Sequence, residues 1–115
     1  MQTITKKYSP TGTTETKAFD LKVSNHARQT WEFYATGTTL RIKLKSVFTD
    51  GNGVELAGSG SGDTAGCDIQ TIDLTQDTLT IVNFDMKLEH VRCTYDNDGG
   101  GAMSGDLWIK ATTAK

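Results

Sequence analysis

Residues 40–45 read LRIKLK, a strict alternation of apolar and basic side chains. A period of two places neighbouring side chains on opposite faces of a β-strand, one face toward a core and the other toward water. The basic side chains of this strand therefore share one face, and they are Arg41, Lys43 and Lys45. We expect a positively charged stripe that either discourages aggregation at a strand edge or contacts an acidic patch on a neighbouring subunit.

Similar apolar runs and alternations occur on both sides of this stretch. Strands are expected at residues 19–23, 31–35, 40–45, 54–57, 67–74, 79–84, 87–95 and 107–111. Threonine, which is β-branched and favours strands, supplies 19 of the 115 residues. About seven or eight strands at short intervals predict an all-β fold. We expect one domain over residues 1–115, a two-sheet antiparallel β-sandwich of jelly-roll or Ig-like type.

Turn residues separate these strands. Residues 50–53, Asp-Gly-Asn-Gly, predict a hairpin turn because Gly and Asn accept the positive φ of tight turns. Residues 58–66 have side chains too small to pack, so a flexible surface loop is expected there. Residues 96–101 predict a second loop, and Glu89 with His90 predicts a bulge. His26 is expected in a turn.

Charge and apolar content exclude several classes of protein. A net charge of −2 argues against a nucleic-acid binder, and no apolar stretch is long enough to cross a bilayer. The charge is uneven, +3 over residues 1–57 and −5 over 58–115. Two interpretations are open: unequal ends that favour head-to-tail contacts between copies, or loops that are acidic without such a role. The N-terminal residues lack a secretory signal, so we expect folding in a cytosol with Cys67 and Cys93 reduced and buried.

The residues that carry chemistry do not gather into a recognisable motif. Two histidines, two cysteines and no nucleophile elbow predict neither a zinc site nor an enzyme, and no cofactor is expected. A loose calcium site remains an alternative, formed by Asp96, Asp98 and Asp106. The competing interpretation is a turn whose carboxylates bond their own backbone.

Two aromatic side chains fall on the outward phase of their strands. These are Tyr34 and Trp108. An exposed tryptophan favours a partner, so the pattern predicts an interface or a platform for stacking a sugar, with cover by the same chain as the alternative.

The end of the chain carries a family resemblance. Residues 86–95 (MKLEHVRCTY), the glycine-rich turn 96–101 and the strand 104–109 (SGDLWI) resemble the end of small β-sandwich virion structural proteins of tailed bacteriophages. The resemblance implies a non-enzymatic virion protein made in the host cytoplasm. It would be a capsid decoration or head–tail protein that packs against its own copies and the major capsid protein. The alternative is a carbohydrate-binding module that presents Trp31, Tyr34 or Trp108.

Overall fold

The expected strands are present in the computed structural model, which describes residues 2–22, 28–37, 40–84, 88 and 90–114. The described elements are, in chain order, β1 (Gln2–Tyr8), β2 (Thr16–Lys22), β3 (Arg28–Ala35), β4 (Arg41–Ser46), β5 (Phe48–Thr49), β6 (Glu55–Leu56), a 3-10 turn η1 (Gly62–Thr64), β7 (Cys67–Asp73), β8 (Thr80–Phe84), β9 (His90–Asp96) and β10 (Leu107–Ala114). The described chain thus has ten strands rather than seven or eight. The additions are β1 and β5, to which the sequence analysis assigns no strand.

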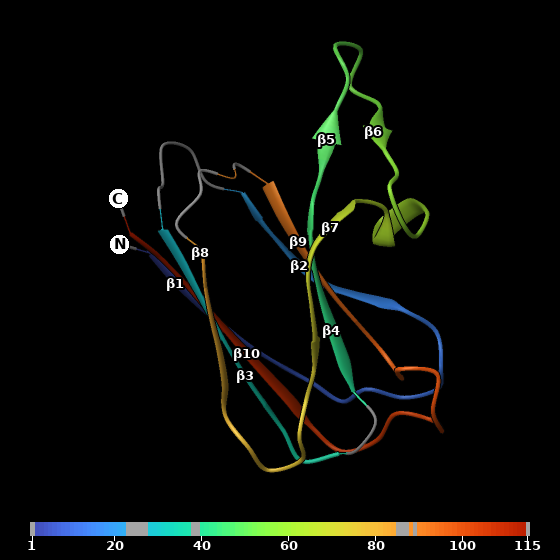
Figure 1. The fold of residues 1–115 in the computed structure, drawn as a ribbon, viewed down its shortest axis with the longest axis vertical. Coiled ribbons are helices and arrows are strands. Elements are labelled where there is room, and N and C mark those ends of the chain that lie inside the picture. Colours follow the sequence, from blue (N-terminus) through green and yellow to red (C-terminus); the bar gives the residue numbers. More distant parts are fainter. Residues whose placement is uncertain (1, 23–27, 38–39, 85–87, 89, 115) are drawn as a thin grey trace.

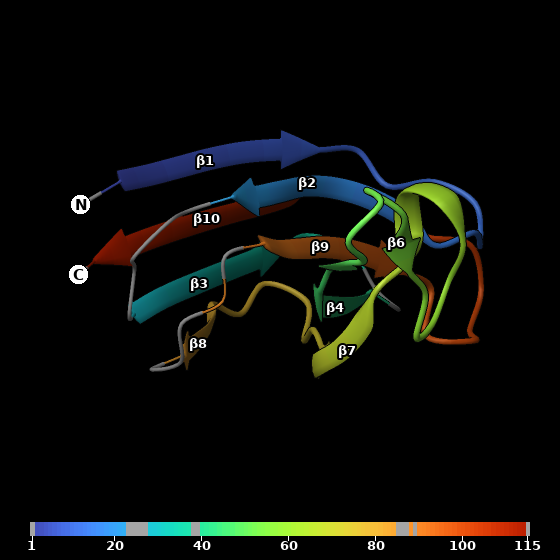
Figure 2. The ribbon, with the colours of Figure 1, turned by 90° about the horizontal axis from the view of Figure 1, so that it is seen from above.

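The strand pairing defines the fold. One sheet has the order β1-β10-β3-β8 and the other β2-β9-β4-β7, and every pair within them is antiparallel. The pairs β1–β10, β2–β9, β3–β8 and β4–β7 are nested, as in one long hairpin rolled into two sheets (Figure 1). Figure 2 shows the two sheets side by side. From the top of the view to the bottom, the strands of one sheet run from β1 to β8 and those of the other from β2 to β7. The all-β sandwich is confirmed, and the nesting is that of a jelly roll.

The core lies between the inner faces of the two sheets. Trp31 and Phe33 of β3 are completely buried, and Trp31 stacks on Phe19 of the other sheet with ring centroids 5.5 Å apart. The indole N–H of Trp31 donates to Oε1 of Gln29 at 3.2 Å, and the Gln29 amide donates to the carbonyl of Leu88 at 3.1 Å. A hydrogen-bonded partner therefore satisfies the one polar atom of the largest core side chain.

The rolled hairpin also mixes the two halves of the chain. Each sheet combines strands from the first half of the chain with strands from the second half. The basic excess of residues 1–57 is therefore interleaved with the acidic excess of 58–115, so the two halves of the chain do not form separate ends of the molecule.

The cysteines are both free thiols, but only one is buried. Cys93 lies in the core, where burial raises the pKa of its thiol, whereas Cys67 is exposed at the start of β7. The two cysteines are not joined to each other, and the expected burial of Cys67 is wrong. Within the described residues, no helix has the length and apolarity needed to cross a membrane.

Candidate interaction surfaces

Residues 48–66 form an arm that joins β4 to β7. Its first part is the β5–β6 hairpin, closed by the expected turn at 50–53, which projects beyond the two sheets (Figure 1). Its second part, residues 57–66, folds back over the outer face of the β2-β9-β4-β7 sheet. A Cβ added to Gly66 would lie 2.7 Å from Cβ of Lys45, so this backbone packs directly on β4. The predicted flexible loop is instead a close cover, which its small side chains permit.

The cover buries one member of the predicted basic stripe. Lys45 has no exposed surface, and its Nζ lies 2.8 Å from a carboxylate oxygen of Glu15 and donates to the carbonyl of Thr64 at 2.6 Å. Glu15 also accepts a hydrogen bond of 2.6 Å from the hydroxyl of Thr94. The expected exposure of Lys45 is wrong, because the arm lies over a strand face that alternation alone assigns to water.

Arg92 of β9 is the centre of the contacts under the arm. Its guanidinium, 4% exposed, donates to both carboxylate oxygens of Asp20 at 2.8 and 3.0 Å and to both oxygens of Glu55 at 3.3 Å. It also donates to the carbonyl of Ala65 at 3.0 Å. One planar group thus joins β2, the hairpin and the glycine-rich cover, a role suited to the five donors of arginine.

The buried charges balance across the strands. Lys45 and Arg92 are direct cross-strand partners, and two like charges in that position repel each other. The carboxylates of Glu15, Asp20 and Glu55 surround them and compensate this repulsion. We call these five residues the arm anchor. Its members come from four segments of the chain, so the sequence gives no local sign of it.

The arm anchor lowers the pKa of Asp20. Burial is the largest single influence and by itself raises the pKa of this carboxyl group, but the hydrogen bonds and the charge of Arg92 lower it. The imidazole of His90 and the charge of Lys17 act in the same direction, and the pKa falls from 3.8 to about 2. Nε2 of His90 is 3.1 Å from the carboxylate, although its alignment is too poor for a hydrogen bond.

A loss of stability in acid follows from this lowered pKa. Asp20 stabilises the folded state fully above its unfolded pKa, and this contribution disappears as the pH falls from about 4 through 2. We expect the free energy of unfolding, measured with urea between pH 5 and pH 2, to fall more steeply for the wild type than for Asp20→Asn. Asp73→Asn, at a carboxylate 61% exposed, should keep the wild-type slope. Equal slopes for the wild type and Asp20→Asn would contradict the prediction.

The other two members of the stripe bind carboxylates of the same chain. Arg41 donates to Asp73 at 2.9 Å and contacts Asp98, and Nζ of Lys43 lies 3.8 Å from Asp96. The stripe therefore has acidic partners without a neighbouring subunit.

The three aspartates of the calcium candidate do not converge. Asp96 and Asp98 lie beside the stripe, whereas Asp106 accepts a hydrogen bond from Ser9 and lies 3.9 Å from Lys7 in the other sheet. Within the described residues, no three side chains of the metal-ligating types come together. Asp96 instead accepts the backbone N–H of Asp98, which is the turn interpretation of this loop.

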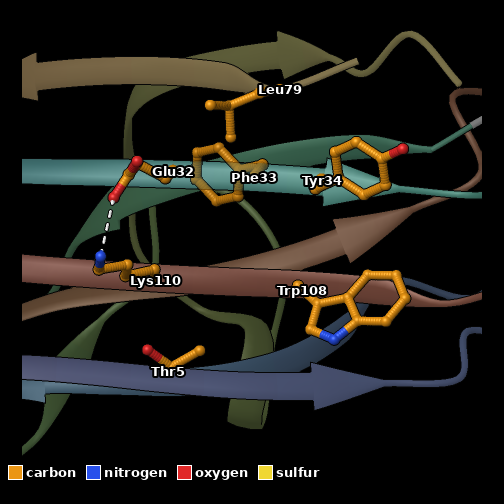
Figure 3. A pocket seen from close by; sticks show the side chains of 7 residues that line it. All are labelled: Thr5, Glu32, Phe33, Tyr34, Leu79, Trp108 and Lys110. Carbon is orange, nitrogen blue, oxygen red and sulfur yellow. Dashed lines mark ion pairs between the residues drawn. The ribbon is translucent and has the colours of Figure 1, made fainter. Parts of the chain in front are cut away.

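The outer face of the β1-β10-β3-β8 sheet carries an aromatic platform. Trp108 and Tyr34 are cross-strand partners that point outward, with ring centroids 6.0 Å apart and planes at 60° (Figure 3). Nζ of Lys7 lies 5.3 Å from the Trp108 ring centroid, a cation–π contact. Beside them is a shallow pocket of about 200 Å³, lined by Thr5, Glu32, Phe33, Tyr34, Leu79, Trp108 and Lys110. We call this pocket, together with the adjoining Ile81, the platform.

The hairpin carries a second apolar surface, which the sequence analysis missed. Phe48 and Leu56 are direct cross-strand partners, 62% and 46% exposed, and Val54 is 56% exposed. Because Glu55 turns toward Arg92, alternation directs the side chains of Leu56 and Val54 away from the body. Among the described residues, the exposed large apolar side chains are these three and two at the platform, Leu79 and Ile81, each 53% exposed.

Three further sequence predictions concern Trp31, the turn at His26 and the bulge at Glu89 and His90. Trp31 is completely buried, so its expected presentation to a carbohydrate is wrong. The predicted turn at His26 lies outside the described residues, as does Glu89 of the predicted bulge; His90 begins β9. Within the described residues, irregularities of pairing occur between Lys17 and Phe19 and between Leu44 and Lys45.

Comparison with known proteins finds similarity in structure but not in sequence. No family model matches the chain, and no curated protein matches it in sequence. The structure is similar to the crystal structure of the SPBc2 prophage-derived protein YomS, with a TM-score of 0.55 and 20% identity. The similarity covers 100% of this chain and 96% of that one, so it extends over the whole domain. At this identity the likeness concerns the fold alone.

Proposed function

We propose that the chain is a phage-related, non-enzymatic structural protein that works by packing against copies of itself and other virion proteins. The observation that carries this proposal is the exposure of two separate apolar surfaces, the hairpin and the platform, on a tightly packed body. Exposed apolar patches of this kind mark sites of contact with other macromolecules. The whole-chain likeness to a prophage-derived protein and the resemblance of residues 86–109 to virion proteins support the phage origin.

A structural role also agrees with how the charged groups are used. The most deeply buried cations, Lys45 and Arg92, bind carboxylates that fasten the arm. In the platform, Glu32 and Lys110 face each other at 3.7 Å. The buried pairs are closed off from a substrate, and the exposed Glu32–Lys110 pair lies in a shallow pocket and not in a deep cleft. Within the virion we place the protein at the capsid surface or the head–tail region, as a decoration protein.

The proposal predicts that the protein is part of the particle. We expect mass spectrometry of purified phage particles to detect it in many copies, and immunogold electron microscopy to label the head or the neck. Particles washed at high salt serve as the control for loosely adsorbed protein. Absence of the chain from intact, purified particles would overturn the virion assignment.

A carbohydrate-binding role is the second candidate, and the platform favours it. Trp108 and Tyr34 offer aromatic faces beside a shallow pocket with polar groups from Thr5, Glu32 and Lys110. Aromatic stacking with a few polar contacts is suited to a sugar ring. Binding on a glycan array that Trp108→Ala abolishes, and that Phe48→Asp leaves intact, would establish this role; an array without signal would exclude the glycans tested.

A further inference from the structure

The apolar face of the hairpin is held in a fixed position. A two-stranded hairpin is only marginally stable in water by itself. Here the carboxylate of Glu55 is held by Arg92 at 3.3 Å, and the N–H of Val47, just before the hairpin, donates to the carbonyl of His90 at 3.1 Å. The arm anchor thus presents Phe48 and Leu56 to solvent as a preorganised surface, which lowers the entropic cost of binding.

The platform offers a complementary surface at the opposite end of the molecule. The hairpin projects at the top of Figure 1, whereas β3 ends and β10 begins at the bottom, along a molecule 39 Å long. Trp108 and Tyr34 belong to these strand ends, and Leu79 directly precedes β8. A protruding apolar group and a shallow apolar pocket at opposite ends cannot meet within one chain. They can meet between two copies.

The charges of the two surfaces are also complementary. The hairpin has no basic side chain, and because Arg92 compensates the charge of Glu55, the negative charge that remains on the hairpin is that of Asp50. The platform is bordered by Lys7 and Lys110, which are 56% and 50% exposed and lie 3.9 and 3.7 Å from their carboxylate partners. Exposed ion pairs at such distances contribute little, so both ammonium groups remain available to an arriving carboxylate. Two acidic hairpins would repel each other, which disfavours a symmetric hairpin-to-hairpin contact.

We propose that the β5–β6 hairpin of one copy docks on the platform of a second copy, so that copies join head to tail. This inference rests on the proposed function and names the surfaces through which the copies would pack. Phe48, Val54 and Leu56 would cover Trp108, Leu79 and Ile81, with Asp50 near the lysines.

Such a contact has two physical consequences. It uses different surfaces on the two partners, so it is heterologous and builds a ring or a filament rather than a closed two-fold dimer. It is also small, since a stable isolated pair buries on the order of 1,600 Å². Each contact is therefore weak, and repetition in an assembly supplies the overall strength.

The test uses variants that disable one surface each. The hairpin variant is Phe48→Asp with Leu56→Asp, the platform variant is Leu79→Asp with Ile81→Asp, and all four side chains are about half exposed, so the body should still fold. Thr71→Asp, on the exposed face of β7, is the matched control. Sedimentation velocity over a wide concentration range measures association, and circular dichroism checks folding. If the platform variant does not fold, Lys7→Glu replaces it.

We expect the wild type and Thr71→Asp to form species larger than a dimer as concentration rises. Each surface variant alone should associate at least about tenfold more weakly, from the loss of buried apolar area. An equimolar mixture of the two variants should form a 1:1 dimer and nothing larger, because each supplies the one intact surface that the other lacks.

Two results would overturn the docking proposal. One is a wild type that stays monomeric at every concentration, and the other is a mixture of the two variants that stays monomeric while the wild type associates. Either result combined with positive labelling of virions would reject the docking mode and leave the structural role in place. A monomeric wild type that binds glycans through Trp108 would replace both with the carbohydrate role.

Discussion

Arg92→Ala should lower the free energy of unfolding by about 3–5 kcal/mol, because it leaves carboxylates beneath the arm without their cation. Arg92 is 4% exposed and binds Asp20 through two hydrogen bonds, and Asp20 is itself only 16% exposed. Removing one partner of a buried pair costs more than the pair contributes, since the remaining charge loses its compensation and does not regain water. Urea unfolding followed by the fluorescence of buried Trp31 measures the loss.

Arg41→Ala is the matched control for this experiment. Arg41 also lies on the outer face of the β2-β9-β4-β7 sheet and also binds a carboxylate through Nε, Asp73 at 2.9 Å. Its side chain is 33% exposed and that of Asp73 is 61% exposed, so solvent screens the pair and Arg41→Ala should cost much less stability than Arg92→Ala. Similar losses for the two variants would contradict the assignment of Arg92 as the centre of the arm anchor.

Arg92→Ala should also loosen the hairpin. Without the guanidinium, Glu55 loses its hydrogen bonds to β9, and the hairpin loses one of the contacts that fix its direction. Hydrogen exchange should show faster exchange at the N–H of Asp50, which donates to Val54 across the turn, than in the wild type. The exchange of β3 amides, measured in the same sample under native conditions, should change less.

The strands and the sandwich could be predicted because they depend on local patterns. The LRIKLK alternation and the 50–53 turn act over a few residues, and both appear where expected. β1 could not be predicted in the same way, since it is an edge strand with mostly exposed side chains and only Ile4 and Tyr8 half-buried. Its strand conformation comes from pairing with β10, about 100 residues away in the chain.

The sequence predicted the exposure of a side chain correctly only where its position in the strand alternation decides whether it is buried. Tyr34 and Trp108 lie on the outer face of their sheet, where the alternation places them, and both are partly exposed, so alternation was sufficient there. Lys45 and Arg92 were not predictable, because a segment inserted between β4 and β7 covers them. The apolar hairpin face was missed for a different reason. Its strands are too short for the alternation to show which side chains face the body, and only the contact of Glu55 with Arg92 reveals this.

Lys45→Met should cost about 3 kcal/mol of stability, whereas Lys43→Met should cost less than about 1 kcal/mol. The two lysines are two residues apart on the same strand face and are equivalent in sequence, but the side chain of Lys45 is fully buried and that of Lys43 is 22% exposed. Methionine keeps the aliphatic stem, so the comparison isolates the ammonium group. Its loss leaves Glu15 and the carbonyl of Thr64 without their strongest partner.

A double variant tests whether Lys45 and Arg92 act as one unit. Lys45 and Arg92 both hold the segment that covers them, through the carbonyls of Thr64 and Ala65. Each is shielded from water only while that segment stays in place. Once Lys45→Met releases the cover, water reaches the carboxylates beside Arg92, so Arg92→Ala should cost less in that background than in the wild type. Urea unfolding of the four proteins measures this coupling, and strictly additive losses would mean that the two cations stabilise the arm independently.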